Sequence, residues 1–413
     1  MGRISTVSRR RLVQTAALGA VTAAVPLRYG RSQARPSLKL GVLLPRTGIL
    51  ASQGTQCVRG YELAVAIAAE QGVTLEIMLA DTESNVDTAR ARAERLVGEG
   101  AQMLSGAFDS GQTLAIAQVA EQRSIPFVIN IAAAPQITDQ GFKYVFRNFP
   151  KAGALITNGL TLMKDLFAAT NTTPRTAVLM HSNDTFGLAQ KQAIDALFPR
   201  LSMPFTFADS ISYDPRARDL SVEVSKARAA RPDLMVVVTR ANDAILIVRE
   251  MVRQRFDVMG LVSPGSPGMY DSQFVSTLGR FAEFAISNVP WVNPNTALAK
   301  QVAAAFAQRY PQENYDGNLF NMAFSLQAAL VGVDAVRRAG STAGPALAEA
   351  LRATRIENHM MIGGPITFDA TGQNDAIPSA AIQVREGRQR VILPAAAADA
   401  QPVFPVPGWT QRG

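Results

Sequence analysis

The feature that most constrains the fold is a strand–loop–helix–strand unit over residues 38–80. It begins with a short, almost wholly apolar run, Leu38 to Leu44, which is typical of a buried strand in a parallel sheet. After a loop that contains Gly and Thr, apolar side chains recur at helical spacing, at Cys57, Val58, Tyr61, Ala64, Val65 and Ala68. Residues 73–79 form the next expected strand. The unit therefore predicts a helix that packs on a parallel sheet.

The same alternation of short apolar runs and helical stripes continues along the chain. We expect further strands at residues 101–104, 125–129, 177–180, 205–208, 234–238 and 259–262. We expect helices at residues 112–122, 152–168, 187–197, 218–230, 242–254, 295–309 and 318–338, and a further helix where Ala89, Ala93, Leu96 and Val97 form an apolar stripe. Such alternation indicates right-handed crossovers and hence an α/β fold with parallel sheets.

Two interruptions divide this pattern into two lobes. The alternation restarts after residues 144–150, and after residues 287–290 two long helices follow with no strand between them. Residues 363–393 add two or three short strands around a turn at Gly372. We expect two α/β lobes joined by more than one crossing. Their predicted bounds are 37–148 with 289–362 for lobe 1, 149–288 with 363–395 for lobe 2, and 396–413 for an extended C-terminal tail.

The N-terminal residues 1–34 hold six arginines and no acidic residue. Residues 8–13, SRRRLV, match the twin-arginine export pattern, and Ser32-Gln33-Ala34 supplies the small residues of a cleavage site. The alternative is a membrane anchor, but the apolar stretch is short, rich in Ala, Gly and Thr, and interrupted by Pro26. We therefore expect a twin-arginine signal peptide, whose removal leaves a soluble periplasmic chain of about 379 residues.

Removal of this segment lowers the formal charge from +8 to +2, because 35 basic residues then face 33 acidic ones. No basic run with interleaved aromatic residues remains, so we expect no nucleic-acid partner. The two histidines, His181 and His359, have no second ligand at metal-binding spacing, and no nucleophile elbow, Walker loop or dinucleotide fingerprint occurs. We expect neither an enzyme nor a metal or cofactor, and we expect Cys57 to be a buried thiol.

The loops that follow the strands are polar and distinctive instead. Residues 109–113, Asp-Ser-Gly-Gln-Thr, open an expected helix whose first N–H groups carry positive partial charge. Such a helix start can seat a carboxylate or another anion. The alternative is ordinary N-capping by Asp109 or Ser110, and both interpretations can hold at once.

Several short motifs occur together in a fixed order along nearly the whole mature chain. They are LPRTGxxAxxG at 44–54, GYELA at 60–64, DTESN at 81–85, YxFRxxP at 144–150, NDxFG at 183–187 and GPITFDxxG at 364–372. This ordered set resembles the type I periplasmic binding proteins that serve ABC importers of the branched-chain amino-acid class. The resemblance implies two Rossmann-like lobes joined by a three-strand hinge, which close on a ligand.

The resemblance also implies ligand-binding positions. Ser110 matches the serine that binds the substrate carboxylate, and Phe186 matches an aromatic residue beside the ligand. Three positions depart from the amino-acid-binding pattern, because Ala133 replaces a threonine, Arg240 a tyrosine, and Gly265 the acid that pairs with the α-ammonium. The full set of expected ligand-binding residues is Gln53, Asp109, Ser110, Thr113, Ala132, Ala133, Phe186, Arg240, Asp243 and Gly265.

These departures bear on the charge of the ligand. A zwitterion without an acid for its ammonium would be costly to bury, although Asp109, Asp243 or Asp271 is an alternative partner. Arg240 favours a second anionic group, and its alternative role is a salt bridge between the lobes.

We therefore expect a monomeric solute-binding protein that delivers a small aromatic or branched aliphatic carboxylate to an ABC permease and its ATPase. The alternatives are a protein that binds branched-chain amino acids or amides for the same importer class, and a ligand-sensing receptor module.

Overall fold

The computed structural model describes residues 1–2 and 35–412. The predicted twin-arginine motif and cleavage site lie outside these residues. Residues 36–412 form one compact unit.

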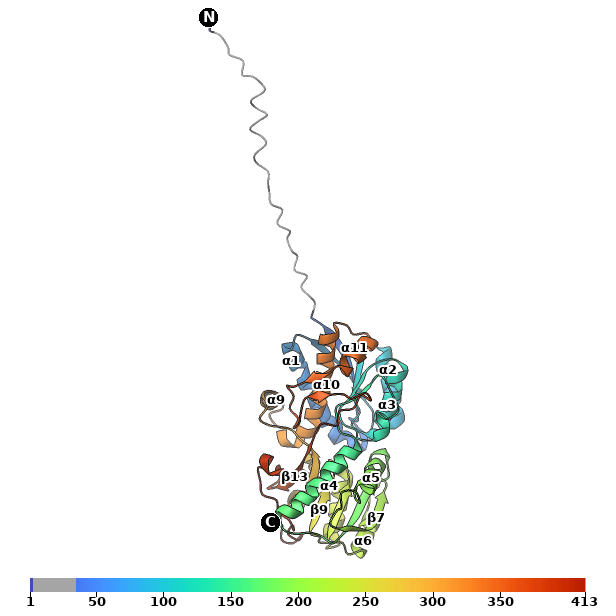
Figure 1. Ribbon diagram of the computed structural model, residues 1–413, viewed down its shortest axis with the longest axis vertical. Coiled ribbons are helices and arrows are strands. Elements are labelled where there is room, and N and C mark those ends of the chain that lie inside the picture. Colours follow the sequence, from blue (N-terminus) through green and yellow to red (C-terminus); the bar gives the residue numbers. More distant parts are fainter. Residues whose placement is uncertain (3–34, 413) are drawn as a thin grey trace. The chain divides into compact units, whose positions relative to one another are not determined.

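Lobe 1, the upper lobe in Figure 1, is built on a sheet of five parallel strands in the order β2-β1-β3-β4-β5. These strands are β1 Ser37–Leu44, β2 Thr74–Asp81, β3 Met103–Gly106, β4 Phe127–Ile129 and β5 Val145–Arg147. Its helices are α1 Ala51–Glu70, α2 Val86–Gly98, α3 Ser110–Gln122, α9 Ala297–Arg309, α10 Tyr315–Ala339 and α11 Gly344–Arg352. Helix α1 packs beside α10, and α2 packs beside α3, so helices from both ends of the chain cover one sheet.

Lobe 2 is built on a seven-stranded sheet in the order β14-β13-β10-β9-β8-β6-β7. Five of its strands are parallel, namely β6 Thr176–Ser182, β7 Thr206–Tyr213, β8 Leu234–Val238, β9 Gly260–Ser263 and β10 Ile286–Pro290. The last two, β13 Ser379–Arg385 and β14 Arg388–Leu393, are antiparallel to their neighbours. Its helices are α4 Ala152–Ala169, α5 Thr185–Leu197, α6 Ser221–Ala229, α7 Ala241–Arg253 and α8 Ser272–Leu278.

The chain passes between the lobes three times. It leaves β5 through residues 148–151 to reach α4, and it leaves β10 through residues 291–296 to reach α9. The third crossing runs through residues 368–378 to β13, after the short pair β11 Arg355–Ile356 and β12 Ile366–Thr367. An isolated parallel bridge between Arg147 and Gln373 joins the first crossing to the third.

Helix α10 forms much of the core of lobe 1. By length and composition alone it would suit a membrane span, but 94% of its most apolar window is buried inside the body. Its apolar residues therefore pack against the sheet and against α1.

The structure differs from the expected elements mainly at their ends. Helix α11 was not expected, because Gly344-Pro345 has the composition of a loop; yet proline suits the first turn of a helix, where no N–H is needed. Strand β7 runs to Tyr213, five residues beyond its predicted end at 208. It lies at the edge of the sheet and most of its residues are exposed, so the sequence there shows no apolar pattern from which its length could be predicted.

Residues 394–412, which follow β14, contain a short turn of helix at Ala395–Ala397 and lie along lobe 2. The ring of Phe404 packs against Phe167, and the indole N–H of Trp409 donates to the carbonyl of Phe256 at 2.7 Å. Apolar anchors thus hold this segment to the lobe although it has little regular secondary structure.

Candidate functional site

A cavity lined by residues of both lobes lies between them, beyond the carboxyl ends of β3 and β4 in lobe 1 and of β8 and β9 in lobe 2. This is the position at which open α/β sheets bind ligands. Its lining residues are Phe108, Ser110, Ile131, Ala132, Ala133, Phe149, Leu155, Phe186, Arg240, Gly265, Pro267, Val289 and Phe320.

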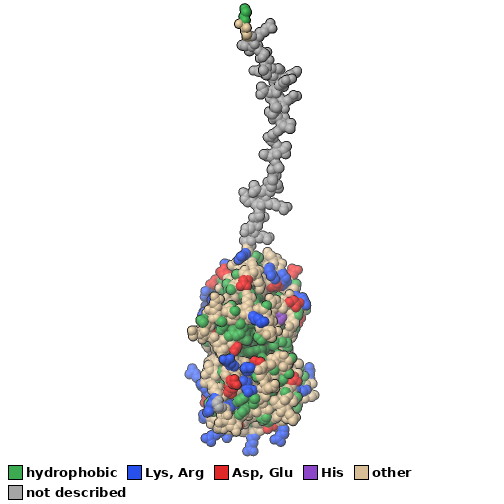
Figure 2. All heavy atoms as spheres, turned by 90° about the vertical axis from the view of Figure 1, so that its left-hand side faces the viewer, with side chains coloured by type: hydrophobic (Ala, Val, Ile, Leu, Met, Phe, Trp, Pro, Cys, Tyr) green, Lys and Arg blue, Asp and Glu red, His purple; other side chains and the backbone are tan. Residues whose placement is uncertain are grey.

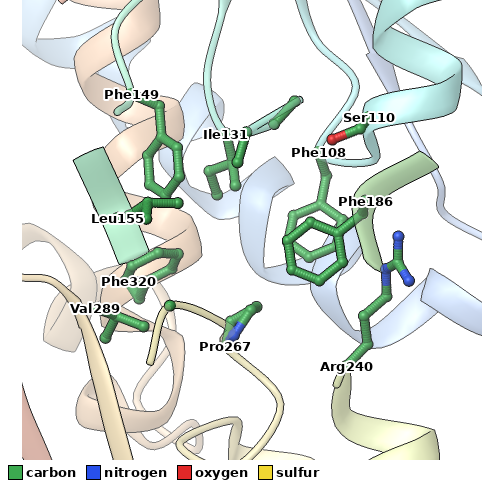
Figure 3. A pocket seen from close by; sticks show the side chains of 13 residues that line it. Phe108, Ser110, Ile131, Phe149, Leu155, Phe186, Arg240, Pro267, Val289 and Phe320 are labelled. Carbon is green, nitrogen blue, oxygen red and sulfur yellow. The ribbon is translucent and has the colours of Figure 1, made fainter. Parts of the chain in front are cut away.

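Four phenylalanine rings contribute to the cavity wall. Phe149 and Phe320 lie on one side, with their ring centroids 6.0 Å apart, and Phe108 and Phe186 lie on the other (Figure 3). In Figure 2 hydrophobic side chains also gather at the waist between the lobes. A cavity with such walls suits a small ligand with an apolar or aromatic body.

On the lobe 1 side, the polar groups of the cavity come from the start of α3 and the loop after β4. Ser110 is the first residue of α3, and its hydroxyl accepts a hydrogen bond from the N–H of Ala134 at 3.4 Å. Asp109 is the N-cap of this helix and accepts from the N–H groups of Gly111 and Gln112. The capping interpretation is therefore confirmed for Asp109. Ser110 lines the cavity, and its role as an anion seat stays a prediction.

The loop between β3 and α3 and the loop after β4 each hold a non-glycine residue with positive φ. The φ values are 60° at Phe108 and 117° at Ala132, conformations that are costly for L-residues. Asn130 stabilises both loops, because its side-chain carbonyl accepts from the N–H groups of Phe108 and Ile131. Its amide in turn donates to Ser325 of α10 at 2.9 Å.

Arg240 closes the cavity on the lobe 2 side. One guanidinium nitrogen lies 2.6 Å from a carboxylate oxygen of Asp109 in lobe 1, and the other lies 2.7 Å from one of Asp184 in lobe 2. Its guanidinium carbon stacks 4.8 Å from the centroid of the Phe186 ring. Arg240 therefore links the lobes, and it lines both the cavity and an outer cleft that both aspartates also line.

The pKa shifts in this cluster follow from burial and charge. Burial alone would raise the pKa of Asp184, but the charge of Arg240 and the N–H of Gly187 bring this pKa below its ordinary value. Burial would lower the pKa of Arg240, and the charges of Asp184 and Asp109 raise it instead. Asp184 and Arg240 are therefore both ionised at neutral pH.

A second contact between the lobes lies at Asp271, the N-cap of α8. Its carboxylate accepts hydrogen bonds from Gln53 of α1 at 2.9 Å and from Gln56 at 3.4 Å. Burial raises the pKa of Asp271, although hydrogen bonds from Gln273, Gln53 and Gln56 oppose this shift. Nearby, the side-chain amide of Asn242 donates to the carbonyl of Ile49 across the cleft at 2.7 Å.

The structure brings together most of the residues named from the sequence. Six of the ten line the cavity, namely Ser110, Ala132, Ala133, Phe186, Arg240 and Gly265. Asp109 contacts Arg240 just outside it. The other three face other partners: Gln53 binds Asp271, the Thr113 hydroxyl donates to the carbonyl of Asp109, and Asp243 accepts from the Tyr213 hydroxyl.

The sequence analysis did not predict three of the four phenylalanines that line the cavity, namely Phe108, Phe149 and Phe320. Phe149 lies in the YxFRxxP motif, and Phe108 lies between the predicted strand 101–104 and Asp109, so both positions carried a usable signal. Phe320 had no such signal, because it is one apolar residue among many in α10.

Comparisons with known proteins agree with this geometry. The sequence profile of the family described as periplasmic binding protein matches residues 37–389. The chain is 24% identical over 387 residues to Leu/Ile/Val-binding protein homolog 7 of Brucella abortus (strain 2308), covering 90% of this chain and 95% of that protein.

Solved structures share the fold. A leucine-binding protein from Thermotoga maritima superposes with a TM-score of 0.73 at 24% identity, covering 86% of this chain and 97% of that one. A solute-binding protein of an ABC transporter from R. palustris, solved with benzoate, gives a TM-score of 0.73 at 18% identity, covering 88% and 98%. The predicted fold class is therefore confirmed.

The family profile spans most of the chain, and the cavity lies at the seam between the two lobes. The chain therefore belongs to the periplasmic binding protein family, the extracytoplasmic solute-binding components of ABC transporters, and not to a family of enzymes.

Proposed function

We propose that this protein binds a small organic carboxylate, aromatic or branched aliphatic, and delivers it to an ABC importer. The observation that carries the proposal is the composition of the cavity wall. The residues that line it include four phenylalanines and one serine but no aspartate or glutamate. An α-ammonium buried there would lack a direct carboxylate partner, whereas an apolar acid would not need one.

Ser110 is the residue that we propose binds the carboxylate of the ligand. It offers a hydroxyl at the N-terminus of α3, where the helix dipole favours negative charge. The aromatic walls suit the body of such an acid, and the relative from R. palustris was solved with benzoate.

The second candidate is a branched-chain amino acid. Arg240 carries one positive charge and faces two carboxylates, so this cluster keeps a net negative charge beside the cavity that could attract an ammonium group. The curated relative from Brucella abortus is named a Leu/Ile/Val-binding protein homolog.

Calorimetry with matched ligand pairs separates the two candidates. 4-Methylpentanoate differs from leucine, and 3-phenylpropanoate from phenylalanine, only in the α-ammonium. We expect residues 35–413 to bind at least one of these acids at least about tenfold more tightly than its amino-acid counterpart, since an unpaired buried charge costs several kcal/mol. Tighter binding of leucine than of 4-methylpentanoate would instead assign the protein to the amino-acid class.

Closure of the lobes is the proposed mechanism. Residues 37–148 with 289–362, and residues 149–288 with 363–395, are proposed to move as units about the three crossings. Ligand contacts with both units would favour the closed state, which the permease and its ATPase then read. We propose that Arg240 stabilises closure through Asp109 and that the protein acts as a monomer.

We also propose export by the twin-arginine route. The support is the SRRRLV motif, which carries the paired guanidinium groups that define this pattern. Replacing Arg9 and Arg10 with lysine should leave full-length precursor in the cytoplasm. Mature protein that begins near Arg35 in the double variant would contradict this route.

A further inference from the structure

Arg147 is a fully buried arginine that lies behind the cavity rather than in its wall. It is the last residue of β5, has 0% of its surface exposed, and is among the largest fully buried side chains of the described chain. Burial lowers its pKa to about 10, so it remains a cation at neutral pH.

The guanidinium of Arg147 binds only neutral acceptors. One terminal nitrogen donates to the carbonyls of Ala132 at 3.1 Å and Ala134 at 2.8 Å. The other donates to the hydroxyl of Thr138 at 2.7 Å, and Nε donates to the side-chain carbonyl of Gln373 at 2.5 Å. Within residues 35–412 no carboxylate forms an ion pair with it, and Asp139, Asp369 and Asp375 act on its charge only from a distance.

This cation lies directly behind the loop that borders the ligand cavity. Ala132 and Ala133 line the cavity, and the carbonyls on either side of Ala133 both accept from Arg147. The same hydrogen bonds hold Ala132 at its unfavourable φ of 117°. Because a trans peptide directs its C=O and N–H to opposite sides, the N–H of Ala133 faces away from the guanidinium. That N–H donates to no protein acceptor in the part of the chain that the structure describes.

Arg147 also joins this loop to the crossings. The side chain of Gln373, in the third crossing, accepts from Arg147 and donates to the carbonyl of Phe149 at 2.7 Å. Phe149 lies in the first crossing and its ring forms part of the cavity wall.

We propose that Arg147 is a specificity-determining positioning residue, which makes the cavity select an anionic over a neutral ligand without touching it. It fixes the loop so that the N–H of Ala133 is available to an anion beside Ser110. Its uncompensated charge, in a region of low dielectric, favours negative charge on the ligand. This inference rests on the proposed function, since it concerns the charge of the same ligand.

The test measures preference for an acid over its amide. Benzoate with benzamide, and 4-methylpentanoate with 4-methylpentanamide, are pairs of nearly equal shape that differ in charge. We expect wild-type protein to prefer the acid, and we expect Arg147→Met to lower the acid-to-amide affinity ratio on the order of tenfold. Arg147→Lys should retain most of the acid-to-amide affinity ratio, because lysine keeps the positive charge. It should bind both ligands more weakly, because lysine lacks the planar guanidinium that holds the loop.

A second pair of variants leaves Arg147 in place, in case its removal prevents folding. Thr138→Asp puts a carboxylate beside the guanidinium, and Thr138→Asn puts an uncharged group of the same size there. We expect the aspartate variant to lose the acid preference and the asparagine variant to keep it. A purely structural role for Arg147 would change both affinities together and leave their ratio unchanged.

The two proposals fail in different ways. An acid preference that is the same in wild type, Thr138→Asp and Thr138→Asn overturns the role of Arg147 and leaves the proposed function intact. Wild-type protein that binds neither acid, or prefers the amides, overturns the proposed function and this inference with it.

Discussion

Asp243 shows how one buried residue links the site to pH. It lies in the first turn of α7, where one carboxylate oxygen accepts from the Tyr213 hydroxyl at 2.6 Å and the other accepts from the backbone N–H of Arg240 at 2.8 Å. Burial raises its pKa from 3.8 to about 6, although the Tyr213 hydroxyl and the charge of Arg240 oppose the shift. Asp243 thus orients Arg240, which closes the cavity. Ionisation of Asp243 lowers the stability of the folded protein.

The expected pH dependence follows from the sign of this shift. Because the pKa is higher in the folded than in the unfolded state, the contribution of Asp243 is complete below about pH 4 and is lost as the pH rises through about 6. The loss is on the order of 2–3 kcal/mol. Chemical denaturation of wild type and Asp243→Asn at pH 4.5 and 7.5 measures it, since asparagine does not titrate. We expect the stability of wild type relative to the variant to be higher at pH 4.5, and parallel profiles would contradict the assignment.

At the scale of secondary-structure elements, the wall of the cavity depends on how closely α4 approaches the loop after β9. A Cβ atom on Gly159 would lie 1.7 Å from the carbonyl oxygen of Pro264, and the side chain of Asn288 donates to the carbonyl of Gly159 at 2.9 Å. That loop carries Gly265 and Pro267, which line the cavity. Glycine is therefore required by the packing of two backbones.

Two alanine substitutions in the same helix test this contact. Gly159→Ala should destabilise the protein by about 1–3 kcal/mol through overpacking, and should weaken ligand binding because the loop must shift. Gly153→Ala is the matched control, since no atom lies within 4 Å of its added Cβ. It should be neutral or should stabilise the protein by roughly 0.5–1 kcal/mol, the usual gain for alanine in a helix. Equal effects in thermal denaturation would contradict the packing argument.

At the scale of the whole molecule, polar groups fasten the two lobes at three places around the cavity. These are the Arg240–Asp109 ion pair, the hydrogen bonds of Asp271 with α1, and the hydrogen bond from Asn242 to Ile49. Only the ion pair borders the cavity itself. Its strength should therefore contribute directly to the free energy of closure, and hence to ligand affinity.

Two variants of unchanged size test whether the carboxylates around Arg240 affect ligand affinity by linking the lobes or only by holding Arg240 in place. Asp109 and Asp184 both cap helices and both face Arg240, but only Asp109 lies in the other lobe. Asparagine caps a helix about as well as aspartate. Asp109→Asn should therefore weaken ligand binding by about 1–3 kcal/mol, the usual value of a hydrogen bond to a charged group. Asp184→Asn should have a smaller effect on affinity by calorimetry, and the reverse order would exclude Arg240 as the link between the lobes.

Small-angle scattering tests closure itself. Mature wild-type protein should become more compact when the preferred acid is added, through rotation about the crossings near Phe149 and Pro290. Asp109→Asn should require more ligand for the same change. An unchanged radius of gyration at saturating ligand would remove the closing mechanism while leaving ligand binding unaffected.

The alternation of apolar runs and helical stripes was sufficient to predict the α/β class, the parallel strands and most helices, because these depend on local periodicity. Local signals also predicted that residues 109–113 would open a helix, with Asp109 or Ser110 at its cap. The ordered motifs led to the family, and six of the ten expected residues line the cavity.

Only the tertiary structure decided which charges meet. Arg240 lies 131 residues from Asp109, Gln53 lies 218 from Asp271, and Arg147 lies 226 from Gln373. In the sequence Arg240 could equally have been a ligand contact or a bridge, because an arginine fork fits any carboxylate within reach. Arg147 gave no sign that its partners would be neutral, since burial and the carbonyls that surround it arise only when β5, the loop after β4 and the third crossing pack together.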